Sequence, residues 1–201
     1  MIDTLTGLAQ TQNDNVVNEE VGILHEKKIV KMPVEGSYYL TESASPMTII
    51  QKDSLVHQDI YGIYNIRDDR FEIGSIAIAG EMVWKFEQGE NIYIRASTLK
   101  PSLEEGDVFF KVLHEGLYDL YVAKEVVFKP SNYNLIMDTG SRSDTYIKED
   151  VYYMFQDQKL VVKSKSIKKI GKFIAESRPS NKLKKPKTEA TVKEWLAQMD
   201  E

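Results

Sequence analysis

The chain has 201 residues, of which 42% are hydrophobic and 28% are charged, and its formal net charge is −5. This apolar content is ordinary for a folded domain and argues against disorder along the whole chain. The sequence contains no cysteine, which excludes a disulfide framework, a cysteine-ligated metal centre and a cysteine nucleophile. The length suits one domain with terminal extensions.

The first half of the chain predicts a polar arm followed by short strands. Residues 1–20 are rich in Thr, Gln, Asn and Asp and show little periodicity, which is typical of a flexible arm. Pro33 to Gly36 has the composition of a turn. Runs of β-branched and aromatic residues between turn residues predict strands. These runs are 21–32, 47–51, 55–57, 61–66, 71–73, 76–79, 82–86 and 92–96.

The second half predicts longer strands. Residues 108–113 and 117–128 are joined by a turn that contains Gly116, and residues 145–155 and 159–163 pair across a second turn. Residues 101–107 and 132–143 read as loops. Repeated short strands with frequent turns predict a mainly β fold, as an antiparallel β-sandwich or a partly open barrel of about ten strands.

The hydrophobic period changes to that of a helix near the C-terminus. Residues 166–176 place apolar side chains at helical spacing, and residues 188–199 repeat the pattern with Val192, Trp195 and Leu196 on one stripe. A Pro- and Lys-rich linker separates them. The predicted organisation is an arm (1–20), a β-rich domain with a C-terminal helix (21–176), a linker (177–187) and a terminal helix (188–201).

The charge is unevenly distributed. Residues 159–201 carry 12 basic and 5 acidic residues, so the rest of the chain is strongly acidic. One hypothesis is a tail that docks Lys182, Lys184 and Lys185 on an acidic partner. The alternative, which we favour, is a solvated surface segment, because lysine runs are usually exposed to water.

The segment Asp138-Thr139-Gly140 resembles the active-site loop of aspartic peptidases. That chemistry needs two aspartates that share a proton, so a single copy serves only in a symmetric dimer. The sequence has no second Asp-Thr-Gly, and a Lys-rich, partly helical segment follows the motif. We therefore favour a surface turn, in which Asp and Gly are common, and keep a dimeric peptidase that uses Asp138 as an alternative.

No cofactor or metal site is predicted. The three histidines, His25, His57 and His114, lie far apart and match no metal-binding spacing. The acidic clusters at Asp68-Asp69 and Glu104 to Asp107 match no calcium loop and read as solvated turns. Nucleotide-binding glycine motifs and the Gly-x-Ser-x-Gly motif are absent from the sequence.

Tyrosines are frequent in the predicted β body. Tyr61 and Tyr64, with Trp84 and Arg95, are candidates to line a groove for a carbohydrate or a peptide. The alternative is ordinary cross-strand packing with the hydroxyl groups at the rim, which we favour. Nucleic acid is an unlikely ligand in either case, because these residues lie in the acidic part of the chain.

Several short segments, in order, resemble an uncharacterised family of small exported (periplasmic or envelope) proteins of Bacteroidota. The similarity extends over roughly residues 36–196, and Tyr38 stands where the family usually has proline. The resemblance implies export with removal of a signal peptide, and it implies no catalytic residue. The similar segments are Gly36-Ser37-Tyr38-Tyr39-Leu40, Tyr64-Asn65, Asp69-Arg70-Phe71-Glu72, Phe109 to Gly116, Leu120-Tyr121, Tyr152-Tyr153 and Lys168-Lys169.

These observations lead to three functional hypotheses. The first is a non-enzymatic, extracytoplasmic binding or assembly module at the bacterial cell envelope, with an envelope protein or glycan as its partner. The second is the dimeric peptidase, and the third is a cytoplasmic regulator with a docking tail. No run approaches the roughly 18 apolar residues that a membrane helix requires, so no transmembrane segment is expected.

Overall fold

A computed structural model of the chain describes residues 34–99, 107–134, 136–177 and 186–200. The predicted arm, the predicted strand at 21–32 and most of the predicted linker lie outside these ranges. The chain divides into two units, Met1–Lys31 and Met32–Glu201, and the description below concerns the second.

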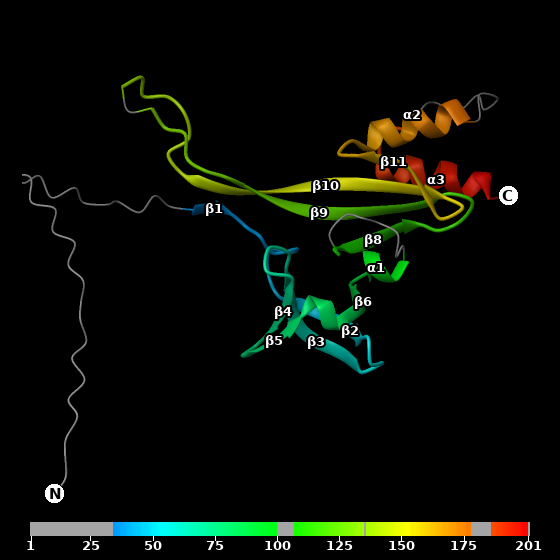
Figure 1. The fold of residues 1–201 in the computed structure, drawn as a ribbon, viewed down its shortest axis with the longest axis horizontal. Helices are drawn as coiled ribbons and strands as arrows, with labels where there is room; N and C mark the ends of the chain where they lie inside the picture. The colour runs from blue at the N-terminus through cyan, green and yellow to red at the C-terminus, as the bar shows by residue number, and fades with distance from the viewer. Residues whose placement is uncertain (1–33, 100–106, 135, 178–185, 201) are drawn as a thin grey trace, which may run out of the picture. The chain divides into compact units, whose positions relative to one another are not determined.

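The second unit is built on one large sheet with 11 strands (Figure 1). Its strands are β1 (Val34–Gly36), β2 (Ser45–Gln51), β3 (Val56–Asn65), β4 (Arg70–Ile73), β5 (Ile76–Ala79), β6 (Val83–Gln88), β7 (Asn91–Arg95), β8 (Phe109–His114), β9 (Asp119–Lys129), β10 (Asp144–Gln156) and β11 (Lys159–Ser164). Its helices are a short 3-10 turn (Gly80–Met82), α1 (Ala96–Leu99), α2 (Ile167–Ser177) and α3 (Glu189–Met199).

The strand order is β1-β10-β9-β8-β7-β6-β2-β3-β4-β5, and β11 pairs with β10. All pairings are antiparallel except that of β1, which runs parallel to β10. The strands β1 and β11 share one edge of β10, β1 along its first residues and β11 along its last. The sheet is not closed into a barrel, because the end strands of the described order, β1 and β5, are not paired with each other.

The register aligns one continuous row of side chains across the centre of the sheet. Residues directly opposite each other on neighbouring strands project from the same face. The row therefore places residues far apart in the sequence side by side on one surface. It runs through Ile49, Phe86, Tyr93, Lys111, Val122, Tyr152 and Ser164.

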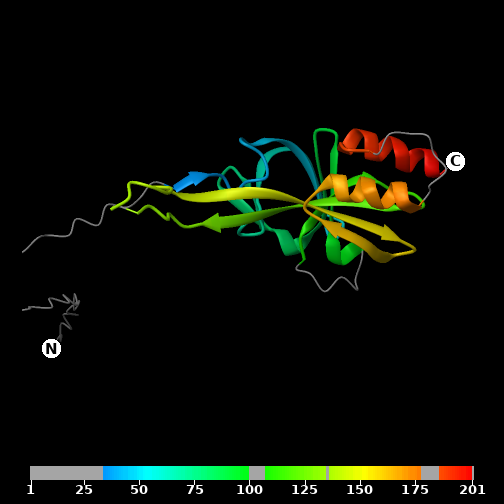
Figure 2. The ribbon, with the colours of Figure 1, turned by 90° about the horizontal axis from the view of Figure 1, so that it is seen from above.

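The helices α2 and α3 cover this face over β8, β9 and β10 (Figures 1 and 2). Leu196, at 1% exposure, and Ile170, at 0%, pack against Leu120 and Met154 of the sheet. The helix α3 starts at a capping box, in which Thr188 Oγ1 accepts from the backbone N–H of Thr191 and the Thr188 N–H donates to Thr191 Oγ1. The amphipathic stripe expected from the sequence is thus the docking face of α3.

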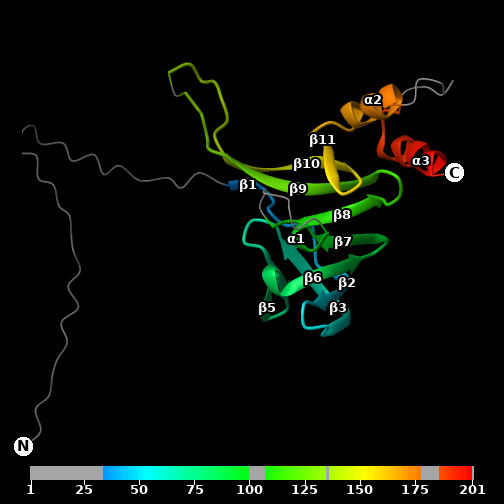
Figure 3. The same cartoon turned by 45° about the vertical axis from the view of Figure 1, so that its right-hand side comes forward.

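The strands β2 to β7, whose ribbons are seen in Figure 3, carry a second, aromatic core, to which β8 adds Phe109. Strand β3 bends within its length, and Asp59 has a positive φ of 51° beside a break in the β2–β3 register. The first part of β3 pairs with β2 and its last residues pair with β4. The rings of Tyr64, Phe71 and Phe86 meet inside the curve, with centroids 4.8 to 5.8 Å apart.

The predicted mainly β fold with one or two C-terminal helices is confirmed, and both helices lie within one residue of their predicted bounds. Two local predictions are wrong. Residues 34–36, predicted as a turn, form β1, because their partner is the distant β10 rather than a local strand. Residues 55–57 and 61–66 were predicted as separate runs, but all of their residues except Leu55 and Ile66 belong to the single bent strand β3.

Because α3 docks through its buried face, truncation of a side chain on that face should lower the free energy of unfolding. We expect Leu196→Ala to lower the free energy of unfolding by about 2–5 kcal/mol, because the change leaves a cavity in the core. Gln198→Ala, on the exposed face of the same helix, is the matched control and should stay within about 0.5 kcal/mol of the parent. Urea denaturation measures both, and equal effects would contradict the docking described here.

Candidate functional site

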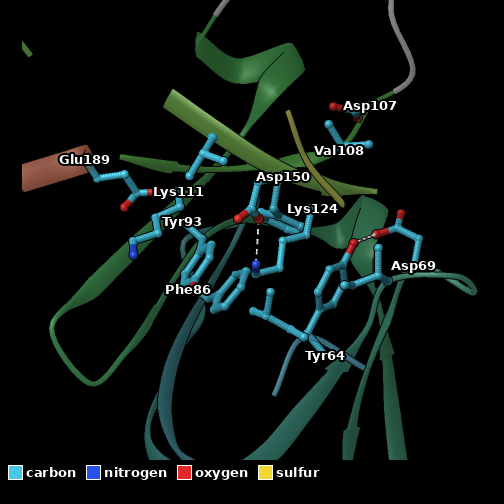
Figure 4. Close-up of a pocket in the computed structure, with 14 residues that line it drawn as sticks. Tyr64, Asp69, Phe86, Tyr93, Asp107, Val108, Lys111, Lys124, Asp150 and Glu189 are labelled. Carbon is cyan, nitrogen blue, oxygen red and sulfur yellow. Dashed lines mark hydrogen bonds and ion pairs between the residues drawn. The ribbon is translucent and has the colours of Figure 1, made fainter. Parts of the chain in front are cut away.

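A pocket of about 130 Å³ opens on the face that carries the central row (Figure 4). Its floor comes from β6 to β10, one wall from the end of β3 and the turn that follows it, and another from the first turn of α3. Its lining combines aromatic, aliphatic and charged side chains. The lining residues are Leu40, Tyr64, Ile66, Asp69, Phe86, Tyr93, Asp107, Val108, Phe109, Lys111, Val122, Lys124, Asp150 and Glu189.

Aromatic rings form the apolar part of the pocket. Phe86 and Tyr93 are stacked, with centroids 4.4 Å apart and ring planes at 3°, and Tyr64 lies 5.8 Å from Phe86. Burial raises the pKa of Tyr64 and the pKa of Tyr93, and the charge of Asp69 adds to the rise for Tyr64. Both hydroxyl groups are therefore neutral near pH 7 and present donors rather than charges.

A buried arginine lies next to the aromatic part of the pocket. Arg95 is 1% exposed, and its guanidinium donates to both carboxylate oxygens of Asp69 at 2.9 and 2.7 Å and to Asp107 at 3.1 Å. The guanidinium carbon also lies 4.7 Å from the centroid of the Phe109 ring. The planar fork of arginine suits this bidentate contact, and a buried charge of this kind needs such partners.

The partners of Arg95 are themselves held in place. Asp69 accepts a hydrogen bond of 2.7 Å from the Tyr64 hydroxyl, and its backbone has a positive φ of 47°. A Cβ at position 80 would collide with the Asp69 carboxylate, so a larger residue there would push this carboxylate out of its present position. Burial opposes ionisation of Asp107, but hydrogen bonds from Ser97 and the charge of Arg95 outweigh it and lower its pKa.

The remaining carboxylates of the pocket are engaged as well. Lys124 contacts Asp150 at 2.6 Å, across the β9–β10 pair. The Tyr152 hydroxyl donates to Glu189 of α3 at 2.8 Å. Burial and then this carboxylate raise the pKa of Tyr152. The hydrogen bond joins the sheet to the first turn of α3 and so fixes the far wall of the pocket.

Lys111 differs from the other charged residues of the pocket. It is partly buried in the central row between Tyr93 and Val122. Within the part of the chain that the structure describes, its ammonium group has neither a hydrogen bond nor an ion pair. Figure 4 shows Lys111 beside Tyr93, on the side of the pocket where Glu189 lies.

The fold places only some of the residues that were expected to line a groove at the pocket. Tyr64 lines the pocket. Arg95 is not a lining residue, but it binds Asp69, which lines the pocket. Tyr61 is 67% exposed, and neither it nor the partly buried Trp84 is among the lining residues. Lys182, Lys184 and Lys185 lie outside the described residues.

Several pocket residues were missed by sequence reasoning. The acidic clusters were predicted to be solvated turns. Asp69 does lie in a turn, and the side chains of Asp69 and Asp107 are 39% exposed, but both also bind Arg95, which the sequence did not reveal. A signal existed in Lys111, a lone charge inside the apolar run from Phe109 to Leu113. No local signal pointed to Glu189, whose place depends on the docking of α3.

Asp138 lies in the loop between β9 and β10, away from the pocket. Its carboxylate is 74% exposed and contacts Arg142 at 2.7 Å, and the Tyr133 hydroxyl donates to it. Hydrogen bonds from Tyr133 and then Arg142 lower the pKa of Asp138. Asp138 and Gly140 have positive φ angles of 48° and 97°, as in the surface turn that we favoured. An aspartic dyad instead requires a carboxyl group that retains a proton.

The described histidines serve structural contacts. His57 lies 3.0 Å from the Gln51 amide nitrogen, and His114 lies 2.9 Å from a carboxylate oxygen of Asp200. Across the described ranges, no group of three or more His, Asp or Glu residues is arranged to hold a metal ion.

Comparison with known proteins finds no matching family model, no matching curated protein and no matching solved structure.

The buried arginine predicts a pH-dependent contribution to stability. Near pH 7 we expect Arg95→Met to lower the free energy of unfolding by about 2–3 kcal/mol, less than for a fully buried pair, because the two carboxylates are 39% exposed. The folded pKa of Asp107 is below its unfolded value of 3.8. This contribution is therefore present above about pH 4 and is lost as the pH falls further.

Urea denaturation at pH 7 and pH 3 measures this effect. The difference between parent and Arg95→Met should shrink at pH 3. Arg70→Met is the control, because Arg70 pairs with Glu72 while 48% of its side chain is exposed, and it should destabilise the protein clearly less than Arg95→Met. An effect of Arg95→Met that is equal at both pH values would argue against the ion-pair network as its origin.

Proposed function

We propose that this protein is a non-enzymatic binding module that holds a small amphipathic ligand in the pocket between the sheet and α3. The observation that carries the proposal is the pocket itself. In it, a stacked aromatic pair lies beside a partly buried lysine that has no ion-pair partner among the described residues. Ligand sites typically combine apolar walls with a few polar groups that fix orientation.

The surroundings favour binding over acid–base chemistry. The carboxylates of Asp69, Asp107 and Asp150 are held by arginine or lysine at 2.6 to 3.1 Å. Such pairs hold the carboxylates in fixed positions. The pKa of Asp107 is also lowered, whereas a general acid or base needs a pKa near the working pH. A pre-formed wall of this kind lowers the entropic cost of binding.

We also propose that the protein acts at the bacterial cell envelope, where an envelope protein or glycan is its macromolecular partner. The support for this location is the sequence resemblance to exported proteins of Bacteroidota. In the part of the chain that the structure covers, no helix has both the length and the apolarity to span a bilayer.

The pocket proposal is tested by titrating the protein with a library of small aromatic and aliphatic compounds while recording amide NMR spectra. We expect binding compounds to shift the signals of Tyr93, Lys111 and Val122. Val108→Phe should weaken binding at least tenfold by filling the pocket. Val161→Phe on β11, a residue that is 36% exposed and outside the pocket lining, should leave it unchanged. A library without a single compound that shifts these signals would refute the proposal.

The location is tested separately by fractionating the native cells and detecting the protein with an antibody. We expect the protein in the periplasmic or outer-membrane fraction, beside an envelope marker. Recovery with a cytosolic marker would overturn the proposed location and leave the pocket proposal intact.

A further inference from the structure

The central row of the sheet contains a single charged residue. Its other members, from Ile49 to Ser164, are uncharged and mostly buried. Lys111 is only partly buried, and its ammonium group is not among the buried, unpartnered polar atoms of the described residues. It stays open to the pocket, where charges next to apolar walls attract each other more strongly than in bulk water.

The carboxylates that line the pocket disfavour the binding of a doubly charged anion. Four of them surround the space, and the cations that face it are Lys111 and Lys124, of which Lys124 is already paired with Asp150. A dianion such as phosphate would meet repulsion from these carboxylates. A singly charged carboxylate matches the one cation that lacks a partner.

The volume and the walls of the pocket limit the size and the chemical character of the remainder of the ligand. The pocket measures about 130 Å³, close to the cavity of about 150 Å³ that accommodates a single benzene ring. Phe86 and Tyr93, whose rings are stacked on each other, supply apolar lining of the pocket next to Lys111. Aromatic and branched aliphatic groups pack well on such surfaces.

We infer that the pocket binds a small monocarboxylate with an aromatic or branched aliphatic body, whose carboxylate pairs with Lys111 while its body packs on Phe86 and Tyr93. This inference rests on the proposed binding function and adds the chemical class of the ligand. The carboxylate comes either from a free acid or from the C-terminus of a short peptide, and the test separates these two sources.

The first experiment compares phenylacetate, phenylacetamide and inorganic phosphate by NMR titration of the full chain. Phenylacetate should bind at least tenfold more tightly than the neutral amide of the same shape, and phosphate should leave the pocket signals in place. The dipeptide glycyl-phenylalanine, tested beside phenylacetate, shows whether the site accepts a peptide C-terminus or the free acid alone.

The second experiment changes the lysine. Lys111→Met keeps most of the side-chain volume and removes the charge, so the advantage of phenylacetate over phenylacetamide should disappear, whereas Lys111→Arg should retain most of it. Lys85→Met is the matched control, because Lys85 is also partly buried on a strand but pairs with Glu87 at 2.7 Å outside the pocket lining. Amide spectra of each variant establish that it is folded.

The outcomes separate the ligand class from the binding function. Equal affinity for phenylacetate and phenylacetamide in the parent protein, or an unchanged preference in Lys111→Met, would overturn the monocarboxylate inference while the pocket remains a binding site. Binding of library compounds that are all neutral or cationic would do the same. Failure of every compound to shift the pocket signals overturns the binding function itself.

Discussion

The ion pairs of Arg95 are the constraint on which the pocket depends. This guanidinium, 1% exposed, lies at the end of β7 and joins two segments that are far apart in the sequence, the β3–β4 turn through Asp69 and the start of β8 through Asp107. A buried charge tolerates few arrangements of its partners, because an unpaired partner is costly. The pairs therefore fix the curved part of the sheet over the floor of the pocket.

The opposite wall depends on a different kind of contact. Apolar burial holds α3 on the sheet through Trp195 and Leu196, and the hydrogen bond from Tyr152 to Glu189 sets the position of its first turn. Apolar burial is non-directional, whereas a hydrogen bond specifies geometry. The pocket thus has one wall set by charge and one set by packing, with the register of the sheet aligning the floor between them.

Local patterns predicted the elements well and their long-range partners poorly. The two C-terminal helices were predicted within one residue of their bounds, since an amphipathic stripe is a local signal. Strand β1 was missed, because three exposed residues become a strand only through pairing with β10, more than a hundred positions away in the sequence. The contact of Asp69 with Arg95 was missed for the same reason, since Arg95 belongs to another strand.

The wall supplied by α3 has a consequence for the order in which the protein gains its function during synthesis. The strands β6 to β10 precede α3 in the chain, so a ribosome makes the floor of the pocket before the helix that carries Glu189. Contacts between segments distant in sequence require the chain between them to close into a loop. Among the described elements, the wall of the pocket is therefore synthesised last, and a site of the proposed kind is complete only once α3 has docked.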